Sequence, residues 1–399
     1  LNGYPGKTAA DATFGTDSPD QQPRGYALDC DGTGDYLDTG SPFQSTHRGS
    51  FSYSFWMKPD DGQPGAAENL LGCDNNADQD AFFITLDTAG KIKIDHEANN
   101  DDASYITDAA VYGDGAGDWT HICVTVTDGD SGNSSYIIYV DGAARAGTLT
   151  NAVAGSEHDD WTSSDNVYIG ATNDDGTALN PFTGKMDEVV LWNVALDADA
   201  VAAIYNSGKP FDLNNNRGNY DNSSALVAYW RMFNGPFDDK ANGAVHDAHN
   251  PGFGAEIVTN GTFDSDLTDW TAEGTDGSNT IVQADGKVVF TADGSTALRL
   301  KQTGVFVVGK TYKVEFDAYD ITGAGLKIQS DSDSNISAIA ADGHYTKYHV
   351  ATGTVLNIYR RTSSSASSGK FDNISIKLLS GFPGLTAADA TFSTDTPDD

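Results

Sequence analysis

The two ends of the chain carry the same peptide. Residues 1–20 read LNGYPGKTAADATFGTDSPD and residues 379–398 read LSGFPGLTAADATFSTDTPD, so that 15 of 20 positions are identical at an offset of 378. A peptide that recurs at a fixed period indicates a tandem array, or a unit whose two ends use one segment for the same task. A shared style of linker sequence is the alternative. We therefore interpret the residues between the copies as the content of one repeat.

The duplicated segment is a candidate for joining neighbouring units. The edge of a β-sheet presents unpaired backbone groups, and a strand from another chain can satisfy them. If one copy completes a neighbour's sheet in this way, its aromatic side chains are the expected anchors. The candidates for subunit joining are Tyr4, Phe14, Phe382 and Phe392. We expect the boundary of the repeat to lie near the shared TAADATF.

Composition limits the classes of partner. At 399 residues the chain has room for about two to three domains, each large enough to bury its own core. The 23 basic and 58 acidic residues give a formal net charge of −35, which is spread along the chain. Such a surface repels nucleic acids and anionic membranes. Its carboxylates are oxygen ligands of the kind that calcium prefers, and adaptation to salty surroundings is the alternative explanation.

The ends and the hydropathy of the chain point to an extracellular piece. No apolar run is long enough for a transmembrane helix, so direct insertion into a membrane is not expected. The chain begins at Leu1 without a signal peptide, which fits a processed or excised part of a longer protein. We expect it at a cell surface or on the surface of a virion.

Residues 21–235 predict an all-β domain. Short alternating runs are separated by turn residues at strand-sized intervals, as in a β-sandwich. We expect hairpins around Asp31-Gly32, Ala89-Gly90 and Asp141-Gly142. The run SFSYSFWMKPD alternates aromatic residues with serine, which predicts a strand with one buried face.

One short helix is expected near residues 197–207. Asp197 can cap the segment ADAVAAIYN, and Gly208 is expected to end it. The cysteines are odd in number and lack metal-ligand spacing, so we expect them at apolar core positions. They are Cys30, Cys73 and Cys123.

The motifs of this domain carry a family resemblance. The order LDCDGTGDYLD, SFWMKPD, GKIKID, WTHICVTVTDG, YVDGAARAG, NVYIGATN and GKMDEVVLWNVALDADAVAAIYNSG resembles the laminin-G-like branch of the concanavalin A-like lectin/glucanase superfamily. The resemblance covers about half of the chain. It implies a two-sheet jelly roll, of the kind often appended to surface or secreted proteins as a binding or adhesion module.

The carboxylates argue against hydrolysis. Glucanases on this scaffold carry carboxylates at alternate positions of one strand, where they act as nucleophile and acid. A cluster like E-x-D-x-E is missing, and the nearest candidates are Asp95, Glu97, Asp187 and Glu188. Asp95 and Glu97 share a face but are expected in a loop. Asp187 falls in phase with Val189, so its carboxylate is expected to face inward, where it needs donors or a cation.

Two acidic loops of the first domain can wrap a hard cation. DNNADQD, residues 74–80, places acceptors at alternate positions, and NDDG, residues 173–176, adds more beside a strand end. The full EF-hand pattern is absent from both, and acidic turns are common in a chain this negative. The candidate calcium ligands are Asp74, Asp78, Asp80, Asn173 and Asp174.

A second β domain follows a linker at residues 236–255. Short alternating strands resume at residue 256, and the pattern N-G-x-F-D…D-W together with the closing F-D-N-I-S-I resembles the galactose-binding-like jelly roll of many carbohydrate-binding modules. The resemblance covers about residues 256–379, before the second copy at 380–399. In such modules the two F-D motifs pair across the sheet and their carboxylates can hold a structural calcium. The matching residues are Asp264 and Asp372.

Aromatic and arginine side chains supply candidates for glycan binding. Aromatic rings stack on sugar faces, and guanidinium groups donate to hydroxyls or carboxylates. The candidates are Trp161 beside His158, then Trp270, Tyr319, Tyr345, Tyr348, Tyr359, Arg360 and Arg361. The alternative for Trp161 is cover of a sheet edge, and for Trp270 a plug in the core. Strand tyrosines are also common at sheet surfaces.

Three hypotheses remain. The first is a non-catalytic extracellular repeat unit of two tandem β-sandwiches, which binds glycans or mediates adhesion within a larger surface protein or fibre. The second is a structural subunit of a filament or virion, joined to neighbouring copies of itself by the duplicated segment. A glycan hydrolase ranks well below both.

Overall fold

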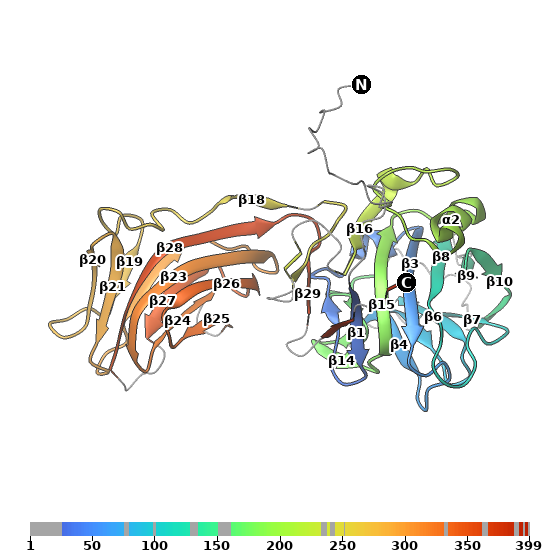
Figure 1. Ribbon diagram of the computed structural model, residues 1–399, viewed down its shortest axis with the longest axis horizontal. Coiled ribbons are helices and arrows are strands. Elements are labelled where there is room, and N and C mark those ends of the chain that lie inside the picture. The colour runs from blue at the N-terminus through green and yellow to red at the C-terminus, as the bar shows by residue number, and fades with distance from the viewer. Residues whose placement is uncertain are drawn as a thin grey trace, which may run out of the picture.

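The chain folds into two β-sandwiches that lie end to end (Figure 1). The computed structural model describes residues 26–75, 80–98, 101–127, 135–150, 161–232, 238–239, 244–250, 252–330, 334–360, 366–386, 391–393 and 396–397. The expected all-β class is confirmed. The N-terminal copy, with Tyr4 and Phe14, lies outside the described residues.

The first sandwich packs two sheets face to face. Sheet I runs in the order β10-β9-β8-β3-β15-β1-β30, with β16 also paired to β15. Its strands are β1 (Ala27–Asp31), β3 (Phe51–Pro59), β8 (Thr120–Thr127), β9 (Ser135–Val140), β10 (Ala143–Arg145), β15 (Thr183–Trp192), β16 (Leu226–Trp230) and β30 (Thr391–Ser393).

Sheet II runs in the order β11-β7-β6-β5-β4-β12-β2-β29-β17, with β13 joining β4 to β14. Its strands are β2 (Leu37–Asp38), β4 (Glu68–Asn75), β5 (Asp80–Leu86), β6 (Ile92–Ala98), β7 (Asp101–Thr107), β11 (Gly147–Thr150), β12 (Tyr168–Ile169), β13 (Thr172–Asp174), β14 (Thr177–Leu179), β17 (Ala244–Val245) and β29 (Gly384–Thr386).

Two of the three predicted hairpins are confirmed and one is wrong. β5 and β6 pair around Gly90, and β9 and β10 pair around Gly142, so both of these hairpins are confirmed. The hairpin expected at Asp31-Gly32 is wrong, because β1 belongs to sheet I and β2 to sheet II. The Asp31 carboxylate accepts a hydrogen bond from the Thr33 backbone N–H at 2.8 Å, and this turn carries the chain across the sandwich.

The expected helix is α2 (Ala198–Tyr205), and it lies over the outer face of sheet I (Figure 1). The Asp197 carboxylate accepts from the Ala200 backbone N–H at 2.8 Å, which confirms the predicted cap. The helix ends before Gly208, at Asn206, whose φ of 47° is left-handed. The other helical turns are α1 (Gln44–His47), η2 (Asn206–Gly208) and η3 (Ser223–Ala225).

Strand β3 is buried on both faces, although its alternation predicted only one buried face. One face meets the core between the two sheets, which contains Phe51, Phe55 and Phe82. The other face lies beneath a second apolar layer, in which Trp192 packs with residues of α2 and of the segment that follows it. This layer allows the serines of β3 to be buried; the hydroxyl of Ser52, for example, donates to the Val194 carbonyl at 2.8 Å. The three cysteines are buried, as expected, and their thiols are free.

The second sandwich also has two sheets around one core. Sheet III runs β20-β21-β28-β23-β26, with β18 on β28, and sheet IV runs β19-β22-β27-β24-β25. The strands of sheet III are β18 (Phe253–Glu256), β20 (Thr280–Ala284), β21 (Lys287–Ala292), β23 (Thr311–Gly323), β26 (Gly343–Val350) and β28 (Ser367–Leu379). Those of sheet IV are β19 (Thr271–Glu273), β22 (Arg299–Thr303), β24 (Leu326–Ser330), β25 (Ser334–Ile339) and β27 (Val355–Arg360).

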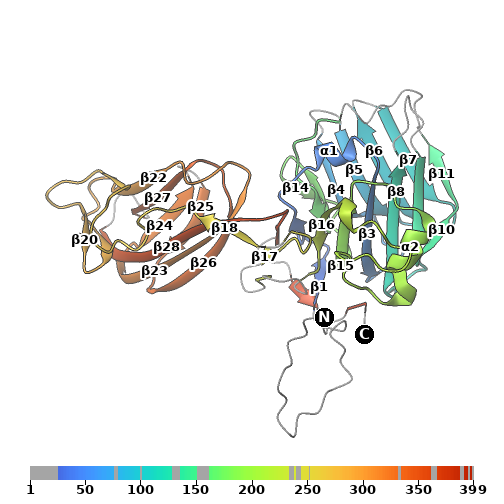
Figure 2. The ribbon, with the colours of Figure 1, turned by 90° about the horizontal axis from the view of Figure 1, so that it is seen from above.

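The second sandwich is inserted between two strands of the first. β17 precedes it and β29 follows it, and the two strands pair, with Ala244 opposite Leu385 and Val245 opposite Gly384. β17 lies inside the range 236–255 that the sequence assigned to a linker. The ends of the insertion are therefore neighbours in sheet II, an arrangement that domain insertion favours. Figure 2 shows the inserted sandwich projecting from this side of the first.

Candidate functional site

The outer face of sheet IV gathers aromatic, amide and basic side chains. Side chains alternate between the two faces of a strand. On β22, β27 and β24 the inward positions include Leu300, Ile358 and Ile328, which are buried in the core. The outward positions follow from the register, in which Arg299 and Lys327 lie opposite Tyr359, Lys301 lies opposite Asn357, and Gln329 lies opposite Asn357. We call this set, with Glu273 of β19, the sheet IV face.

Tyr359 lies at the centre of the sheet IV face. The Nζ atom of Lys327 lies 4.1 Å from the centroid of its ring. Its hydroxyl donates a hydrogen bond to Oε1 of Gln329. Gln329 and Asn357 are buried, although they point away from the core. The face therefore has an amide floor beneath an aromatic ring, the mixture of groups that sugar rings and hydroxyls require.

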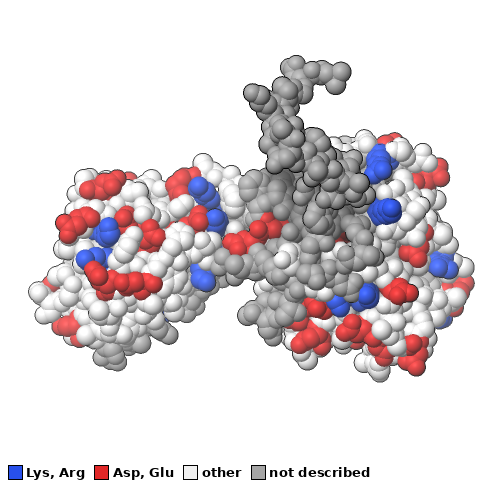
Figure 3. Space-filling view, in the orientation of Figure 1, with Lys and Arg blue, Asp and Glu red and all other residues white. Residues whose placement is uncertain are grey.

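The charges of the sheet IV face are mostly positive. Lys301 Nζ lies 2.6 Å from Oε1 of Glu273, and Arg299 Nε donates to Oε2 of the same carboxylate at 2.9 Å. These hydrogen bonds, from Lys301 first and then Arg299, lower the pKa of Glu273 and keep it ionised. Arg299 and Lys301 thus share one carboxylate, and Lys327 adds a third basic group to the face, in a chain whose net charge is −35. Asp and Glu side chains are scattered over both sandwiches in Figure 3.

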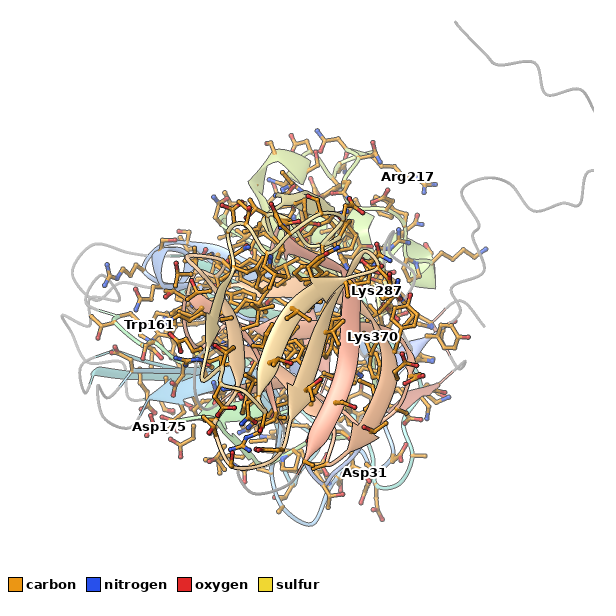
Figure 4. The ribbon with its side chains drawn as sticks, turned by 90° about the vertical axis from the view of Figure 1, so that its left-hand side faces the viewer. Asp31, Trp161, Asp175, Arg217, Lys287 and Lys370 are labelled. Carbon is orange, nitrogen blue, oxygen red and sulfur yellow. The ribbon has the colours of Figure 1, made fainter. Side chains whose placement is uncertain are left out.

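The outer face of sheet III is also polar, and two of its lysines each pair with a carboxylate of their own. Lys287 Nζ lies 3.5 Å from Asp372 and 5.0 Å from the ring centroid of Tyr319. Lys370 Nζ lies 2.6 Å from Asp320. Figure 4 labels Lys287 and Lys370 on this sheet. A ligand at this face would have to compete with existing ion pairs.

A pocket of about 290 Å³ lies at the end of β22. Its lining consists of Ile257, Thr259, Asp269, Gln302, Thr303, Gly304 and Val305. The Gln302 side chain is engaged by the backbone of Thr259, from which it accepts at 3.1 Å and to which it donates at 2.9 Å. Gln302 therefore has a structural role, and the other polar side chains at the pocket are those of Thr259, Asp269 and Thr303.

Most of the glycan candidates from the sequence are packed inside the protein. Trp161 is 0% exposed and lies edge-on to His47. Trp270 is 8% exposed and donates to the carbonyls of Thr259 and Asn260, which corresponds to the core plug. Neither indole presents a face on which a sugar could stack.

Two tyrosines and an arginine are also placed away from the sheet IV face. The ring of Tyr345 stacks on Phe316 at 4.9 Å, and Tyr348 lies against His246 of the first sandwich at 6.0 Å. Arg360 is 4% exposed, and Arg361 lies outside the described residues. Tyr348 lies on the outer face of sheet III but packs against His246, so Tyr319 and Tyr359 are the remaining tyrosines of the predicted set on outer faces, and these belong to different sheets.

Several residues of the sheet IV face were missed by the sequence reasoning. They are Glu273, Arg299, Lys301, Lys327, Gln329 and Asn357. The alternation of RLKQT and LKIQS predicts which side chains share a face of each strand. It does not predict that β22, β27 and β24 are neighbours, since their pairing crosses long stretches of chain.

The two acidic segments predicted in the first sandwich lie side by side at one pair of residues. In the parallel pairing of β13 with β4, Asp174 lies opposite Asp74. Burial raises the pKa of Asp74, and the carboxylates of Asp174, Asp165 and Asp175 raise it further. The Asn173 side chain donates to the Asn166 carbonyl at 2.9 Å. Figure 4 labels Asp175 on this sandwich.

The other calcium candidates have protein partners. Asp80 accepts hydrogen bonds from the backbone and hydroxyl of Thr162, and Asp78 lies outside the described residues. Asp264 accepts from the hydroxyl of Thr262 at 2.8 Å, and Asp372 pairs with Lys287 as noted above. In the described part of the chain, the geometry does not assemble three or more His, Cys, Asp or Glu side chains as a metal site.

Two predictions about carboxylates are corrected. Asp95 and Glu97 lie in strand β6, and not in a loop, because β6 is held between β5 and β7. Asp187 is out of phase with Val189, because a bulge at Glu188, with φ of 51°, adds a residue between them. Val189 faces the core between the sheets, whereas Asp187 lies opposite Trp56, on the side of α2.

The buried carboxylates of this bulge are engaged. Asp187 accepts from the Glu188 backbone N–H at 2.8 Å. Glu188 accepts from the hydroxyl of Tyr229 and from Nε of Arg231, the latter at 3.2 Å. The carboxylate of Glu188 contributes to a raised pKa of Arg231, although burial opposes it. These groups form a structural network between β15 and β16.

Among the described residues, no helix has the length and apolar character needed to cross a membrane.

Two family models match the chain. The model described as the concanavalin A-like lectin/glucanases superfamily matches residues 31–202. A carbohydrate binding domain model matches residues 255–357. Both agree with the families and the order that the sequence motifs resemble. The chain thus contains one segment similar to each of these families, in this order. No curated protein sequence matches it.

Several solved structures are similar to parts of this chain. The carbohydrate-binding module CBM40 of a Ruminococcus gnavus IT-sialidase is 19% identical, with coverage of 45% of this chain and 97% of its own and a TM-score of 0.35. A SAP-like pentraxin from Limulus polyphemus is 13% identical, with coverage of 54% and 91% and a TM-score of 0.36. The CBM22-1 xylan-binding domain of Paenibacillus barcinonensis Xyn10C is 15% identical, with coverage of 32% and 96% and a TM-score of 0.25. These similarities are too weak to transfer a ligand.

Proposed function

We propose that this chain, with its lectin-like and carbohydrate-binding domains, is a non-catalytic glycan-binding unit of an extracellular surface protein or fibre. The sheet IV face is its glycan site in this proposal. The observation that carries it is the position of Tyr359 among three basic side chains and above two amides. A tyrosine ring offers a sugar an apolar face, while lysine, arginine and amide groups donate to its oxygens.

The charge of the sheet IV face favours an acidic glycan. A chain with a net charge of −35 repels anions over most of its surface. Arg299, Lys301 and Lys327 exceed the single carboxylate of Glu273 by two charges, so this face is a local exception. Guanidinium and ammonium groups form strong, charge-assisted hydrogen bonds with carboxylates and sulfates. We therefore expect uronic, sialic or sulfated glycans to bind more tightly than neutral ones.

A glycan array followed by calorimetry tests this proposal. The wild-type chain and Tyr359→Ala are compared on acidic and neutral glycans, with Tyr319→Ala as the matched control on sheet III. Stacking of one aromatic ring is worth about 1 kcal/mol, so Tyr359→Ala is expected to weaken binding by about fivefold or more. Tyr319→Ala should bind as the wild type does. Equal losses from both variants, or no binding to any glycan, would sink the proposal.

A non-catalytic role is tested on the same glycans. The carboxylates of Glu97 and Glu188 are the alternatives from the sequence, and Glu188 is engaged by Tyr229 and Arg231. We expect no turnover of β-glucans or of any glycan that binds. Turnover that Glu97→Gln or Glu188→Gln abolishes would replace the binding module with a hydrolase.

Calcium belongs to the proposal as a structural ion. Asp74 and Asp174 lie opposite one another, and their mutual repulsion is relieved if a cation binds between them. We expect calcium to raise the unfolding temperature of the first sandwich relative to a chelator. Asp174→Asn should remove this rise, whereas Asp285→Asn, at an exposed turn of the second sandwich, should keep it. A rise that survives Asp174→Asn would exclude this pair as the ligand set.

A structural subunit of a filament or virion is the second candidate. The C-terminal copy of the duplicated segment supplies strands β29 and β30 to the first sandwich. Strands that reach a sheet from a distant part of the chain can also be donated between chains. Light scattering of the full chain across a wide concentration range tests this candidate, since growth of long assemblies would favour it over a monomeric binding unit.

A further inference from the structure

The C-terminal copy fills a gap that the first sandwich leaves between its own strands. β29 lies between β2 and β17, with Thr386 opposite Leu37 and Leu385 opposite Asp38. β30 pairs with the outer edge of β1, where Phe392 lies opposite Leu28. We call the edges of β1, β2 and β17 that receive these strands the strand slot. Figure 1 shows β29 on the side of the first sandwich that faces the second.

Specific contacts select the occupant of the strand slot. The ring of Phe382 lies 4.8 Å from that of Phe43, and its carbonyl accepts from Nε1 of Trp230 at 2.7 Å. The Phe382 backbone N–H donates to the buried carboxylate of Asp247 at 3.2 Å. An aromatic residue held by both of its backbone groups therefore anchors the entry of the segment.

Two glycines flank this anchor for steric reasons. Gly381 has φ of 68°, and a Cβ atom there would lie 2.4 Å from a carboxylate oxygen of Asp247. A Cβ atom at Gly384 would lie 2.5 Å from Cγ of Leu37, which is completely buried. The slot thus requires glycine at positions 381 and 384 and an aromatic residue at position 382.

The N-terminal copy meets every one of these demands. Its residues 3–6 are Gly-Tyr-Pro-Gly, against Gly-Phe-Pro-Gly at 381–384. The TAADATF that carries β30 is identical in both copies. The one change of character, Lys7 for Leu385, falls at a position that is half-exposed in the slot, where a lysine can reach solvent. The two copies therefore agree in character at the glycine and aromatic positions that the slot requires.

The N-terminal copy can also reach the slot from within its own chain. β30 pairs with Ala27 through Ser393, and the matching residue of the first copy is Gly15. Neighbouring strands are about 5 Å apart, and a loop of residues 16–26 can span several times this distance. A short tether gives a local concentration of about millimolar, which a second chain does not reach at ordinary protein concentrations.

We propose that the strand slot has two alternative occupants, the C-terminal copy and the N-terminal copy of the same chain. When the N-terminal copy enters, the loop at 16–26 closes a hairpin with β1 and the C-terminal copy leaves. The second sandwich is then attached to the first through β17 alone, because the pairing of β17 with β29 is lost. The slot is therefore an exchange site for the duplicated peptide, and occupancy by one copy exposes the other.

Disulfide trapping tests the exchange directly. Asp29 lies opposite Thr391, and Thr13 is the matching residue of the first copy. A chain with Asp29→Cys, Thr13→Cys and Thr391→Cys is oxidised as a monomer, and peptide mapping measures each crosslink. Adding Gly384→Val blocks the second copy, and we expect it to raise the ratio of the 29–13 to the 29–391 crosslink by about tenfold or more, since the two occupants then differ in steric fit. Gly6→Val is the matched control and should lower the same ratio.

The outcomes separate exchange from simple damage. Without a 29–13 crosslink in the Gly384→Val chain, or with that crosslink found only between two chains, the proposal fails. Unfolding temperatures provide the second measurement. Gly6→Val or Gly384→Val alone should lower that of the first sandwich slightly, whereas the double variant should lower it by much more than the sum. If Gly384→Val alone matches the double variant, the N-terminal copy cannot substitute and the proposal is overturned.

Discussion

The two sandwiches use the outer faces of their sheets in opposite ways. In the first, the outer face of sheet I carries Val190 and Trp192 and is covered by α2 and the following segment. In the second, the outer face of sheet IV carries Tyr359 and basic side chains, and it is the glycan site that we propose. In our proposal, the same architecture gives one face to stability and the other to recognition. The difference lies in the residues at alternate positions of each strand.

The largest effect is expected from replacing Trp192, which packs in the apolar layer on the outer face of sheet I. Trp192 is completely buried and its indole N–H donates to the hydroxyl of Tyr220 at 3.2 Å. Truncating a buried tryptophan leaves a cavity, so Trp192→Ala should lower the free energy of unfolding of the first sandwich by about 3–5 kcal/mol. Tyr359→Ala is the counterpart and should cost about 1 kcal/mol or less, since it removes a half-exposed ring.

Urea denaturation and glycan binding measure these two variants together. We expect Trp192→Ala to lose stability and retain binding, and Tyr359→Ala to do the reverse. If Tyr359→Ala is as destabilising as Trp192→Ala, the sheet IV face is part of the core, and the contrast between the sandwiches disappears.

The next effect concerns Asp247, which holds Phe382, just before β29, against the first sandwich. This buried carboxylate accepts backbone hydrogen bonds from Tyr229, His249 and Phe382. Burial raises its pKa, and these three donors oppose the rise. Asp247→Ala leaves buried N–H groups without an acceptor, at a cost of about 1–3 kcal/mol to the first sandwich.

Asp247→Asn is the matched variant, since its amide oxygen can still accept some of these bonds. We expect it to lose less stability than Asp247→Ala, as measured by thermal unfolding. The second sandwich should be unaffected by either change. Equal losses from the two variants would mean that the charge of Asp247, and not its acceptor geometry, holds the segment.

Acid should distinguish the sandwiches through their buried histidines. Burial lowers the pKa of His121 in the first sandwich to about 3 and that of His349 in the second to about 4. The ordinary pKa of histidine is about 6.5, so below this pH each of these histidines binds a proton in the unfolded chain but not in the folded chain. Stability therefore falls as the pH drops below about 6.5, by about 1.4 kcal/mol per pH unit for each histidine. The loss should end near pH 4 for His349 and near pH 3 for His121.

Denaturation at pH 7, 5 and 4 checks this dependence, with His121→Phe and His349→Phe as separate variants. Each variant should flatten the pH profile of its own sandwich and leave the other unchanged. An unaltered profile for His121→Phe would show that other groups dominate the acid response of the first sandwich.

The sequence correctly predicted features that depend on residues close together in the chain. The hairpins around Gly90 and Gly142 and the Asp197 cap depend on residues that are close in the chain, and all three are confirmed. The crossing after Asp31 and the bulge at Glu188 depend on which strands become neighbours, and local alternation does not contain that information. Both predictions failed for this reason.

The candidate site follows the same division. Tyr359 was predicted from its residue type, because an exposed strand tyrosine is a general sign of recognition. Lys327 and Gln329 were missed, since their contacts with Tyr359 exist only after β24 pairs with β27. The duplicated peptide was recognised at once, but its place in the sheets of the first sandwich required the long-range pairing of β29 with β2.

The smallest expected effect comes from the helix cap of α2, and it tests how strongly the unfolding of α2 is coupled to that of the sandwich beneath it. The Asp197 carboxylate caps α2 through the Ala200 backbone N–H, and loss of such a cap costs about 1 kcal/mol. Asp197→Ala should therefore lower the stability of the first sandwich by about this amount, while Asp199→Ala, at an exposed position of the same helix, should change it less. Hydrogen exchange decides between two forms of coupling. If exchange rises only within α2, the cover opens by itself and sheet I can expose its apolar face. If exchange rises equally in β15, the cover and the sandwich unfold as one unit, and the covered face is a true second core.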